Sequence, residues 1–305
     1  MHACGHGAER VDRPARLAVG VVSAGRVGSA LGAALAAAGH QVIATSGVSR
    51  ASMRRAEALL PGVPLQPPDE VVRHADLVLL AVPDDVLPGL VTGLSRADCF
   101  RPGQIVVHTC GAHGVGVLEP AAAREVLPLA LHPVMTFTGG QEDVQRLTAC
   151  SVGVTAAEFD EAAWSVGEAL VVEMGAEPVR VPERVRPLYH AALAHGANHL
   201  VTLVRDCVEL LEQAGVRPAE QLVAPLLSAA LDNALRHGDR ALTGPVARGD
   251  AGTLRTHLHE LAEHNPEVSA SYRTLAERTA RRAVAAGLLA EHDARAVWTT
   301  LEEAP

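Results

Sequence analysis

The sequence is poor in aromatic residues, in paired cysteines and in long apolar runs. Phe, Trp and Tyr make up only 2% of the 305 residues, so a core must be built mainly from Ala, Val and Leu. The five cysteines are scattered, with no Cys-x-x-Cys pair, which excludes a disulfide framework and indicates reduced thiols in the cytoplasm. No apolar run reaches about 18 residues without a polar interruption, so no membrane span is expected.

Positive charge is also scarce. The 26 basic residues are outnumbered by 35 acidic ones, and the net charge of −9 argues against nucleic acid or an anionic membrane as the main partner. The chain is long enough for two domains, each with its own core. Residues 1–16 are polar and lack the apolar stretch of a signal peptide, so they predict a flexible tail.

Short apolar runs alternate with helical patterns from residue 17 to about residue 155. This alternation is typical of a parallel sheet covered by helices on both faces. The predicted strands are 17–22, 41–45, 77–82, 104–108 and 126–132. The predicted helices between them are 26–38, 51–60, 68–73 and 86–94. Two further edge strands are expected, with a helix at 158–172 between them, at 150–155 and 177–181.

The pattern changes near Pro182, after which only helical periodicity is found. The fold class is therefore α/β, with a Rossmann-type parallel-sheet domain at 17–182 followed by an all-helical domain at 183–305. The predicted helices of the second part are 187–215, 218–237, 250–263, 266–286 and 291–303. The first of these is expected to end at Gly215, as a C′ glycine. Its apolar residues at helical spacing are expected to face a core; they are Leu193, Leu200, Val204, Cys207 and Leu211.

The segment from Leu17 to Gly28 predicts a dinucleotide-binding turn, although glycine-rich turns also occur for packing alone. An apolar strand breaks at small residues, and Gly28 then opens an alanine-rich helix, one residue away from the Gly-x-Gly-x-x-Gly pattern. Ser23 stands where the first glycine belongs, while Gly25 lets backbone amides approach a pyrophosphate. The helix N-terminus adds free N–H groups and the positive end of the helix dipole. The candidate cofactor contacts here are Ser23, Ala24, Gly25, Arg26, Val27 and Gly28.

The residues about 20 positions further along favour NADP over NAD. An NAD site has Asp or Glu there, whereas residues 45–54 contain no acid. Ser49 and Arg50 instead offer a hydroxyl and a guanidinium that suit a 2′-phosphate, and Arg54 lies one helical turn further on. The alternative is that these arginines are the solvated start of a helix.

Two more loops are expected beside the cofactor, because each follows a strand of the sheet. Val82 and Pro83 are predicted to form a wall of the cofactor site, and Asp84 or the next residue to cap the following helix. Thr109 and Cys110, at the end of the next strand, complete the candidate cofactor contacts.

Histidines end two successive predicted strands. His108 and His132 either point into the same crevice or bond to nearby backbone, and the sequence leaves both possibilities open.

One long helix carries the main candidates for chemistry. His190 and Asn198 lie about 80° apart around it and therefore share one broad face. Gly196 between them is unfavourable in a helix interior, and such a glycine often marks the close approach of another backbone or a ligand. His195 and His199 have a spacing that can bind a metal, but no carboxylate or cysteine accompanies them at motif spacing, so no metal site is expected.

A second unusual stretch begins with the turn at Gly244 and Pro245. Asp250 is predicted to cap the next helix. Arg248, between small residues, is a candidate to hold a substrate carboxylate through two hydrogen bonds, unless it pairs with an acid on a neighbouring helix.

Together these motifs resemble the bacterial family of Rossmann-like proteins with a DUF2520 domain. The resemblance covers about residues 17–285 and rests on Val22–Gly28, Ser49-Arg50, Ala81–Asp84, His108–Gly111, His132-Pro133, Tyr189-His190 with Asn198, and Gly244–Asp250. The family is similar to pyrroline-5-carboxylate reductases and 6-phosphogluconate-dehydrogenase-like enzymes. The resemblance implies NAD(P) dependence and a helical second domain that commonly dimerises.

The chain departs from these relatives at two positions. Cys110 stands where the family typically has Ser. Ala194 stands where many hydroxyacid-converting relatives have the Lys of a Lys-x-x-x-Asn pair, and the chain contains no lysine at all. The mechanism of those relatives therefore does not transfer directly.

We predict an NADPH-dependent reductase of a small carbonyl or imine, with a 2-oxo acid as the expected substrate and a ketopantoate-like acid as the specific candidate. His190 is expected as general acid with His132 as its rival, Asn198 as the orienting donor and Arg248 as the anchor of an anionic substrate. A homodimer through the helical domain is expected. The alternatives are a non-catalytic NADP-binding or redox-sensing protein, and an enzyme for a cyclic imine or a prephenate-like acid.

Overall fold

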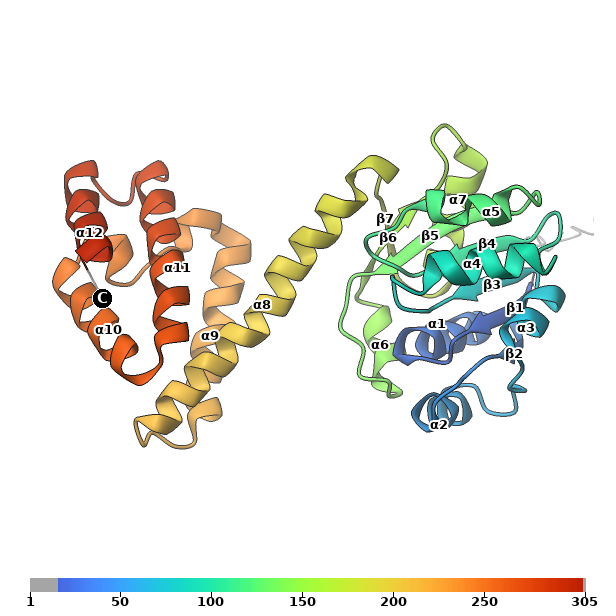
Figure 1. The fold of residues 1–305 in the computed structure, drawn as a ribbon, viewed down its shortest axis with the longest axis horizontal. Helices are drawn as coiled ribbons and strands as arrows, with labels where there is room; N and C mark the ends of the chain where they lie inside the picture. The colour runs from blue at the N-terminus through green and yellow to red at the C-terminus, as the bar shows by residue number, and fades with distance from the viewer. Residues whose placement is uncertain (1–15, 304–305) are drawn as a thin grey trace, which may run out of the picture. The chain divides into compact units, whose positions relative to one another are not determined.

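The apolar runs of the first half form a seven-stranded sheet in the structure, a computed structural model that describes residues 16–303 (Figure 1). The strand order is β2-β1-β3-β4-β5-β6-β7, and all neighbours are parallel except β5 and β6. The strands are β1 Ala18–Val22, β2 Gln41–Thr45, β3 Leu77–Leu80, β4 Ile105–His108, β5 Leu127–Pro133, β6 Ser151–Thr155 and β7 Glu177–Arg180. The α/β prediction with a Rossmann-type sheet is confirmed.

The sixth strand corrects one expectation. β6 lies between β5 and β7, so only β7 is an edge strand, and β6 runs antiparallel to β5. The connection between β5 and β6 contains a single short helix, α6 (Glu142–Leu147). Six residues are too few to run back along a sheet, as a parallel crossover requires. The chain therefore enters β6 at the same end of the strands at which it leaves β5, and β6 runs in the opposite direction.

Seven helices accompany this sheet among the described residues. They are α1 Arg26–Ala37, α2 Arg50–Leu59, α3 Pro68–His74, α4 Leu87–Arg96, α5 Glu119–Ala122, α6 Glu142–Leu147 and α7 Glu161–Glu173. The longer ones match the predicted ranges to within a few residues. The sequence did not predict α5 or α6, because four or six residues make fewer than two helical turns, too few for a repeat of apolar residues to be recognised.

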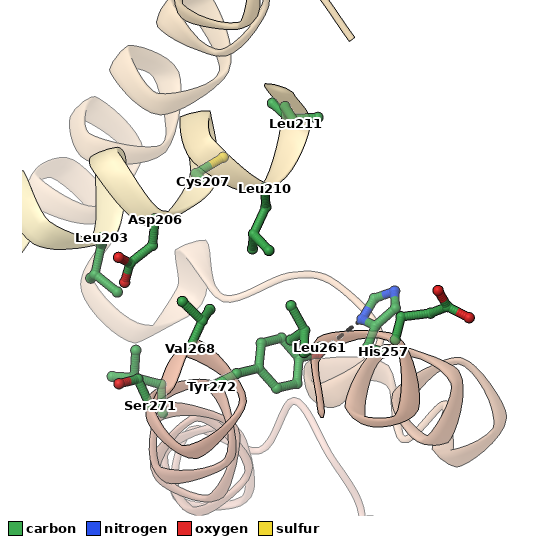
Figure 2. Close-up of a pocket in the computed structure, with 12 residues that line it drawn as sticks. Leu203, Asp206, Cys207, Leu210, Leu211, His257, Leu261, Val268, Ser271 and Tyr272 are labelled. Carbon is green, nitrogen blue, oxygen red and sulfur yellow. Dashed lines mark hydrogen bonds between the residues drawn. The ribbon is translucent and has the colours of Figure 1, made fainter. Parts of the chain in front are cut away.

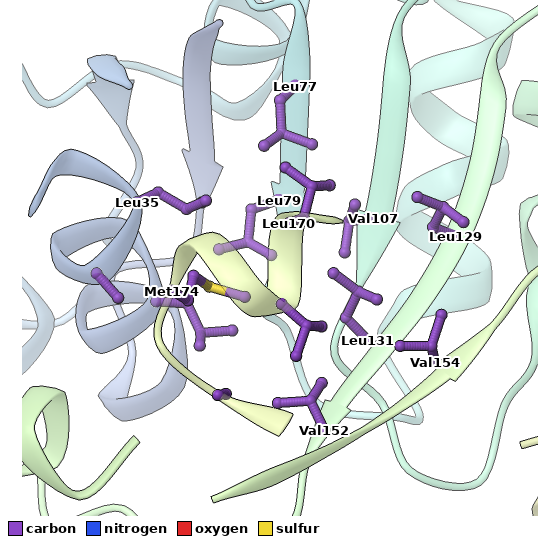
Figure 3. Packing of buried hydrophobic residues seen from close by; sticks show 14 of the residues in the cluster. Leu35, Leu77, Leu79, Val107, Leu129, Leu131, Val152, Val154, Leu170 and Met174 are labelled. Carbon is purple, nitrogen blue, oxygen red and sulfur yellow. The ribbon is translucent and has the colours of Figure 1, made fainter. Parts of the chain in front are cut away.

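The two faces of the sheet are buried by different helices. Alternate strand residues point to opposite faces, so Leu79 packs in one cluster and Val78 in the other. Figure 3 shows the first cluster, where Leu131 and its strand neighbours meet α1 and α7. The second cluster joins the sheet to α3 and α4, with Val91 completely buried. Each such leucine or valine stabilises the fold by about 1.5–3 kcal/mol.

The chain divides into two compact units, and the division falls between His195 and Gly196, inside the 28-residue helix α8 (Arg186–Gln213). The predicted tail of residues 1–16 lies, apart from Arg16, outside the described residues. The change from mixed structure to helices alone follows β7, as expected near residue 182.

The second unit is helical over its described residues. Its helices after α8 are α9 Ala219–His237, α10 Ala251–His264, α11 Pro266–Ala285 and α12 Glu291–Glu303, all close to their predicted ranges. Helices α10, α11 and α12 share a core around Leu254, Leu258 and Val297. Gly215 ends α8 with φ of +77°, and Val216 N donates to Leu211 O at 2.9 Å, so the predicted C′ glycine is confirmed.

The predicted core face of α8 is only partly correct. Leu200 is 40% exposed, whereas Val208, which the pattern did not single out, is buried against Ala219 and Val223 of α9. Helical periodicity identifies an apolar face but does not say what covers it. The other four residues of that face are half-buried: Leu193, Val204, Cys207 and Leu211. Within residues 16–303, no helix is both long and apolar enough to span a bilayer.

Candidate active site

The turn after β1 has the shape that the dinucleotide pattern predicts. Ser23 has φ of +78°, in the left-handed region that favours glycine, which explains why a glycine is typical at this position. Ser23 N donates to Ser46 Oγ at 2.8 Å, and Ala24 N donates to Ser46 O at 2.6 Å. The ends of β1 and β2 are thereby fixed to each other.

The two glycines of the turn differ in their surroundings. A Cβ on Gly28 would lie 2.2 Å from Ser23 O and 2.9 Å from Ala81 Cβ, so only glycine lets α1 approach the sheet this closely. A Cβ on Gly25 would meet nothing nearer than Ser23 Oγ at 3.5 Å. Gly25 is also the N-cap of α1, and no side chain caps the helix. An open backbone at an uncapped helix N-terminus fits a pyrophosphate.

The start of α2 carries the predicted 2′-phosphate contacts. Ser49 is the N-cap, and its hydroxyl accepts from Ser52 N at 3.0 Å while Ser52 Oγ accepts from Ser49 N at 3.0 Å. The hydroxyl of Ser49 therefore has a capping role of its own. Arg50 and Arg54 are exposed, and neither has a carboxylate partner within the described part of the chain. The N-terminus of α2, with two unpaired guanidiniums, suits an anion.

The loops after β3 and β4 hold each other. Neither acid of the loop after β3 caps α4, whose N-cap is Val86, so the predicted cap is wrong. The carboxylate of Asp84 instead accepts from Ala112 N at 3.3 Å. The thiol of Cys110 donates to Val82 O at 3.5 Å. These two bonds connect the loop that carries Val82, Pro83 and Asp84, the predicted cofactor wall, to the segment that follows β4.

Thr109 and Cys110 turn their side chains inward. Cys110 is 2% exposed, and burial raises the pKa of its thiol far above the usual value, so the thiol stays protonated. Thr109 is also buried, and its N–H donates to Leu80 O at 3.2 Å. Burial leaves mainly backbone atoms of these two residues for the predicted cofactor contacts.

The two strand-end histidines have different roles in the structure. His108 is fully buried, with Nε2 2.8 Å from Gly114 O and Nδ1 accepting from Cys110 N at 3.2 Å. A neutral ring that donates through Nε2 and accepts through Nδ1 satisfies both bonds. Burial lowers the pKa of His108 to about 4, which keeps the ring neutral. His108 therefore holds backbone together and has no free ring nitrogen for a ligand.

His132 and His190 converge beside Gly111, just past the end of β4. The two rings meet edge to face, with centroids 5.9 Å apart. A Cβ on Gly111 would lie 2.4 Å from His190 Cδ2, 2.9 Å from His132 Nε2 and 3.0 Å from His190 Nε2, so both rings pack against the bare backbone of this glycine. His132 Nδ1 lies 2.9 Å from the hydroxyl of Tyr189. The sequence predicted both histidines separately, but Gly111 and Tyr189 as their neighbours only emerge in the fold.

Arg186, the first residue of α8, is the functional candidate that the sequence did not reveal. It is 0% exposed and has no ion pair among the described residues. Its five N–H groups donate to five neutral oxygens, at 2.8–3.4 Å: Thr155 Oγ1 and the carbonyls of Cys110, Gly111, Ala130 and Gly153. Burial lowers its pKa, but a guanidinium remains charged in a protein. A positive charge with no carboxylate partner thus lies next to the histidine pair.

The remaining predicted site residues belong to the second unit. Asn198 is exposed, and a Cβ on Gly196 would meet no atom within 4 Å, so the close backbone approach expected there is not found in the described chain. Arg248 is exposed and pairs with no acid among residues 16–303. Asp250 caps α10 by accepting from Thr253 N at 3.0 Å, as predicted.

The second unit contains a cavity of about 450 Å³ between α8, α10 and α11 (Figure 2). Its wall is almost entirely apolar, with Leu203, Leu261 and Val268 among its residues. His257 and Tyr272 lie in the same wall, and Tyr272 Oη is 2.9 Å from His257 Nδ1. Across the described residues, no three His, Cys, Asp or Glu side chains are grouped so as to hold a metal.

Two family models match this chain. The model of the Rossmann-like domain matches residues 5–133, and a domain of unknown function, DUF2520, matches residues 150–279. The chain pairs a Rossmann-like domain with a DUF2520 domain. The resemblance stated from its motifs is confirmed.

Two solved structures show the same fold. A Bacteroides fragilis protein provisionally named an NADP oxidoreductase is 20% identical, with a TM-score of 0.72 over 87% of this chain and 98% of that one. A Plasmodium falciparum pyrroline carboxylate reductase with NADP bound is 12% identical, with a TM-score of 0.56 over 92% and 98% of the two chains. At these identities the likeness concerns the fold alone.

A short stretch is also similar to a curated protein of another kind. A type III pantothenate kinase of Anaplasma marginale is 34% identical over 97 residues, which are 30% of this chain and 38% of the kinase. The chain spans well under half the length of this relative.

Proposed function

We propose that this DUF2520 protein is an NADPH-dependent reductase of a small carbonyl or imine, with a 2-oxo acid of the ketopantoate type as its substrate. The observation that carries the proposal is the convergence of His132 and His190 beside Gly111, at the carboxyl end of β4. Ligands of open α/β sheets bind at that edge. Structures with the same fold are named as an NADP oxidoreductase and a pyrroline carboxylate reductase, which supports the reaction class.

The proposed cofactor site lies at the N-termini of α1 and α2 in the first unit. Gly25 and the uncapped N-terminus of α1 fit the pyrophosphate, and Arg50 with Arg54 is proposed to bind the 2′-phosphate. Bound NADPH supplies a hydride, and every other requirement of the reaction falls to the chain.

Reduction of C=O or C=N needs a proton donor, a hydrogen bond to the reacting atom and an anchor for the substrate. His190 is proposed as the proton donor, and His132 as the group that polarises the reacting atom. The orienting role of Asn198 and the anchoring role of Arg248, both in the second unit, stay predictions from the sequence. Imidazole suits proton transfer because its ordinary pKa lies near neutrality. The buried charge of Arg186 favours an anionic substrate close to the histidine pair.

Titration of the purified protein with NADPH and NADH, followed by nicotinamide fluorescence, tests the proposal. Wild type is expected to bind NADPH at least tenfold more tightly than NADH, because a bidentate arginine–phosphate contact contributes about 1.5–3 kcal/mol. Arg50→Ala is expected to remove this preference without weakening NADH. Arg96→Ala, which changes an exposed arginine of α4, is the matched control.

The outcomes separate the reductase from its alternatives. Binding of NADPH followed by its oxidation on addition of 2-oxo acids or cyclic imines supports an enzyme. Binding without turnover for any of them favours a redox-sensing protein that only binds NADP. Absence of binding for both nucleotides overturns the proposal.

We also propose that two copies of the chain associate through the helical unit. Helices α8 and α9 expose leucine and valine side chains there, among them Val201, Leu222, Leu226 (67% exposed) and Leu235 (80% exposed). Exposed apolar surface of this kind is typical of an interface. Light scattering is expected to give twice the mass of one chain at micromolar concentration. Leu226→Glu should shift it to one chain, and Leu288→Glu, between α11 and α12, should not.

A further inference from the structure

We propose that Arg186 and Tyr189 hold His132 in one neutral form whose Nε2–H group lies beside Gly111. In this form His132 donates a hydrogen bond to the substrate oxygen or nitrogen, and His190 alone gives up a proton. The inference rests on the proposed reductase function and assigns separate roles to the two histidines, which the sequence treated as rivals. Arg186 and Tyr189 are positioning residues, because they act through His132.

The first step concerns the hydroxyl of Tyr189. Burial raises the pKa of Tyr189, so the phenol keeps its proton at neutral pH. Its hydroxyl has a single hydrogen-bond partner among the described residues, His132 Nδ1 at 2.9 Å. The hydroxyl therefore donates and Nδ1 accepts. A neutral imidazole that accepts through Nδ1 carries its proton on Nε2.

The second step is that Tyr189 has little freedom to turn away. Its hydroxyl fits beside Gly153, where a Cβ would lie only 2.7 Å from the oxygen. The guanidinium of Arg186 lies 5.7 Å from the centre of the phenol ring, a favourable cation–π distance. Arg186 in turn is fixed by five hydrogen bonds, which leave it no N–H group for a substrate.

The third step is the charge that surrounds His132. Burial, the Arg186 guanidinium and the His190 ring all disfavour a positive charge on His132, and only Asp84 favours it. Together they lower the pKa of His132 to about 4. At neutral pH the ring is therefore a neutral donor, with no second proton to deliver.

These steps define how the two imidazoles divide the reaction. The substrate carbon accepts a hydride, the electron pair of the C=O or C=N bond moves to the oxygen or nitrogen, and that atom takes the proton of His190. The Nε2–H of His132 donates a hydrogen bond to the same atom throughout and keeps its proton. Bound NADPH would supply the hydride and be oxidised in doing so, and His190 is reprotonated from water.

Nitrogen-15 NMR of histidine-labelled protein tests the inference without substrate or NADPH. Its shifts distinguish a ring protonated on Nε2 from one protonated on Nδ1, and His132→Asn identifies the signal. In wild type, His132 is expected to be protonated on Nε2 and not to titrate between pH 5.5 and 8. Tyr189→Phe is expected to redistribute the proton between the two nitrogens. Arg186→Met is expected to raise the pKa of His132 by a measurable fraction of a pH unit or more.

The matched control is Tyr272→Phe, which removes the other tyrosine hydroxyl that contacts a histidine Nδ1. It is expected to leave the His132 signal unchanged. A wild-type His132 that is protonated on Nδ1, that titrates near pH 6.5, or that is unaffected by Tyr189→Phe overturns the inference. If Arg186→Met does not fold, the tyrosine variant still decides, because it keeps the aromatic ring.

Kinetics add a second readout once a substrate is found. Tyr189→Phe should lower kcat about tenfold or more and leave the affinity for NADPH within twofold of wild type. Failure of NADPH to bind wild-type protein contradicts the proposed function but not the state of His132. The two failures are therefore distinguishable.

Discussion

The chain contains two tyrosines, and each places its hydroxyl 2.9 Å from the Nδ1 atom of a histidine in a different unit. The rings of His132 and Tyr189 meet at 84°, and those of His257 and Tyr272 at 79°. The local contact is thus the same in both units. The surroundings differ, because the first pair has a buried guanidinium and a second imidazole beside it, while the second lines a mostly apolar cavity.

The comparison shows that a histidine–tyrosine contact is not by itself a site. Such a pair fixes a ring and its tautomer wherever it occurs. Chemistry needs in addition a second reactive group within reach and a reason for a ligand to come there. In the first unit His190 and Arg186 are the proposed candidates for these two roles. In the second unit the pair lines a cavity, but among the described residues no buried guanidinium and no second imidazole lies in the wall of that cavity.

The largest expected effect concerns turnover. His190→Asn is expected to lower kcat at least 100-fold, since general acid catalysis typically contributes a factor of 10² to 10⁴. His257→Asn, the corresponding change in the second unit, should leave kcat within about threefold of wild type. NADPH oxidation under saturating substrate measures both. An equal loss of kcat in the two variants would contradict the proposed catalytic difference between the two units.

The next effect is on stability in acid. The pKa values of His108 and His132 are lowered to about 4 in the folded chain, against about 6.5 when unfolded. Their stabilising contribution is therefore complete above pH 6.5 and is lost as the pH falls towards 4. When the pH falls from 7 to 5, the free energy of unfolding is expected to drop by about 2 kcal/mol for each of these two histidines.

Urea unfolding at pH 5, 7 and 8 measures this loss. His132→Asn should remove about half of the difference between pH 7 and pH 5. Both histidines contribute little to a difference between pH 7 and pH 8, because both are then mostly neutral in the folded and the unfolded chain. An unchanged acid sensitivity in His132→Asn would contradict the lowered pKa.

The smallest effect compares the hydroxyls directly. Tyr189→Phe and Tyr272→Phe each lose one hydrogen bond and should lower the free energy of unfolding by about 1 kcal/mol. By stability the two variants are expected to be alike. Only Tyr189→Phe should alter the state of the site histidine, so a large difference in stability would point to a structural role for one tyrosine.

Much of the fold could be predicted from local patterns. The turn from Ser23 to Gly28 is predictable because strand, glycine spacing and helix start are adjacent in sequence. Helix α12 has the predicted bounds because its apolar residues repeat over 13 residues between clear breaks. The direction of β6 could not be predicted, since it depends on where a 17-residue connection returns to the sheet.

The site was less predictable, for physical reasons. His108 and His132 look alike in the sequence, since both end an apolar strand. What separates them is the partner of each ring nitrogen, backbone for His108 and Tyr189 for His132. Arg186 precedes a proline at the start of a helix, a place where an arginine is ordinarily solvated. Nothing local indicates that carbonyl groups of β5, of β6 and of the segment after β4 surround it.

The five hydrogen bonds of Arg186 also affect motion. Helices usually fray at their ends, where opening requires the least free energy. The first turn of α8 is different, because its first side chain is bound to residues of β5, β6 and the segment after β4. Tyr189 and His190 follow three and four residues later, about one helical turn along. The helix end that carries His190, the proposed proton donor, thus opens only when contacts to the sheet break, and the backbone amide of His190 should exchange hydrogen slowly.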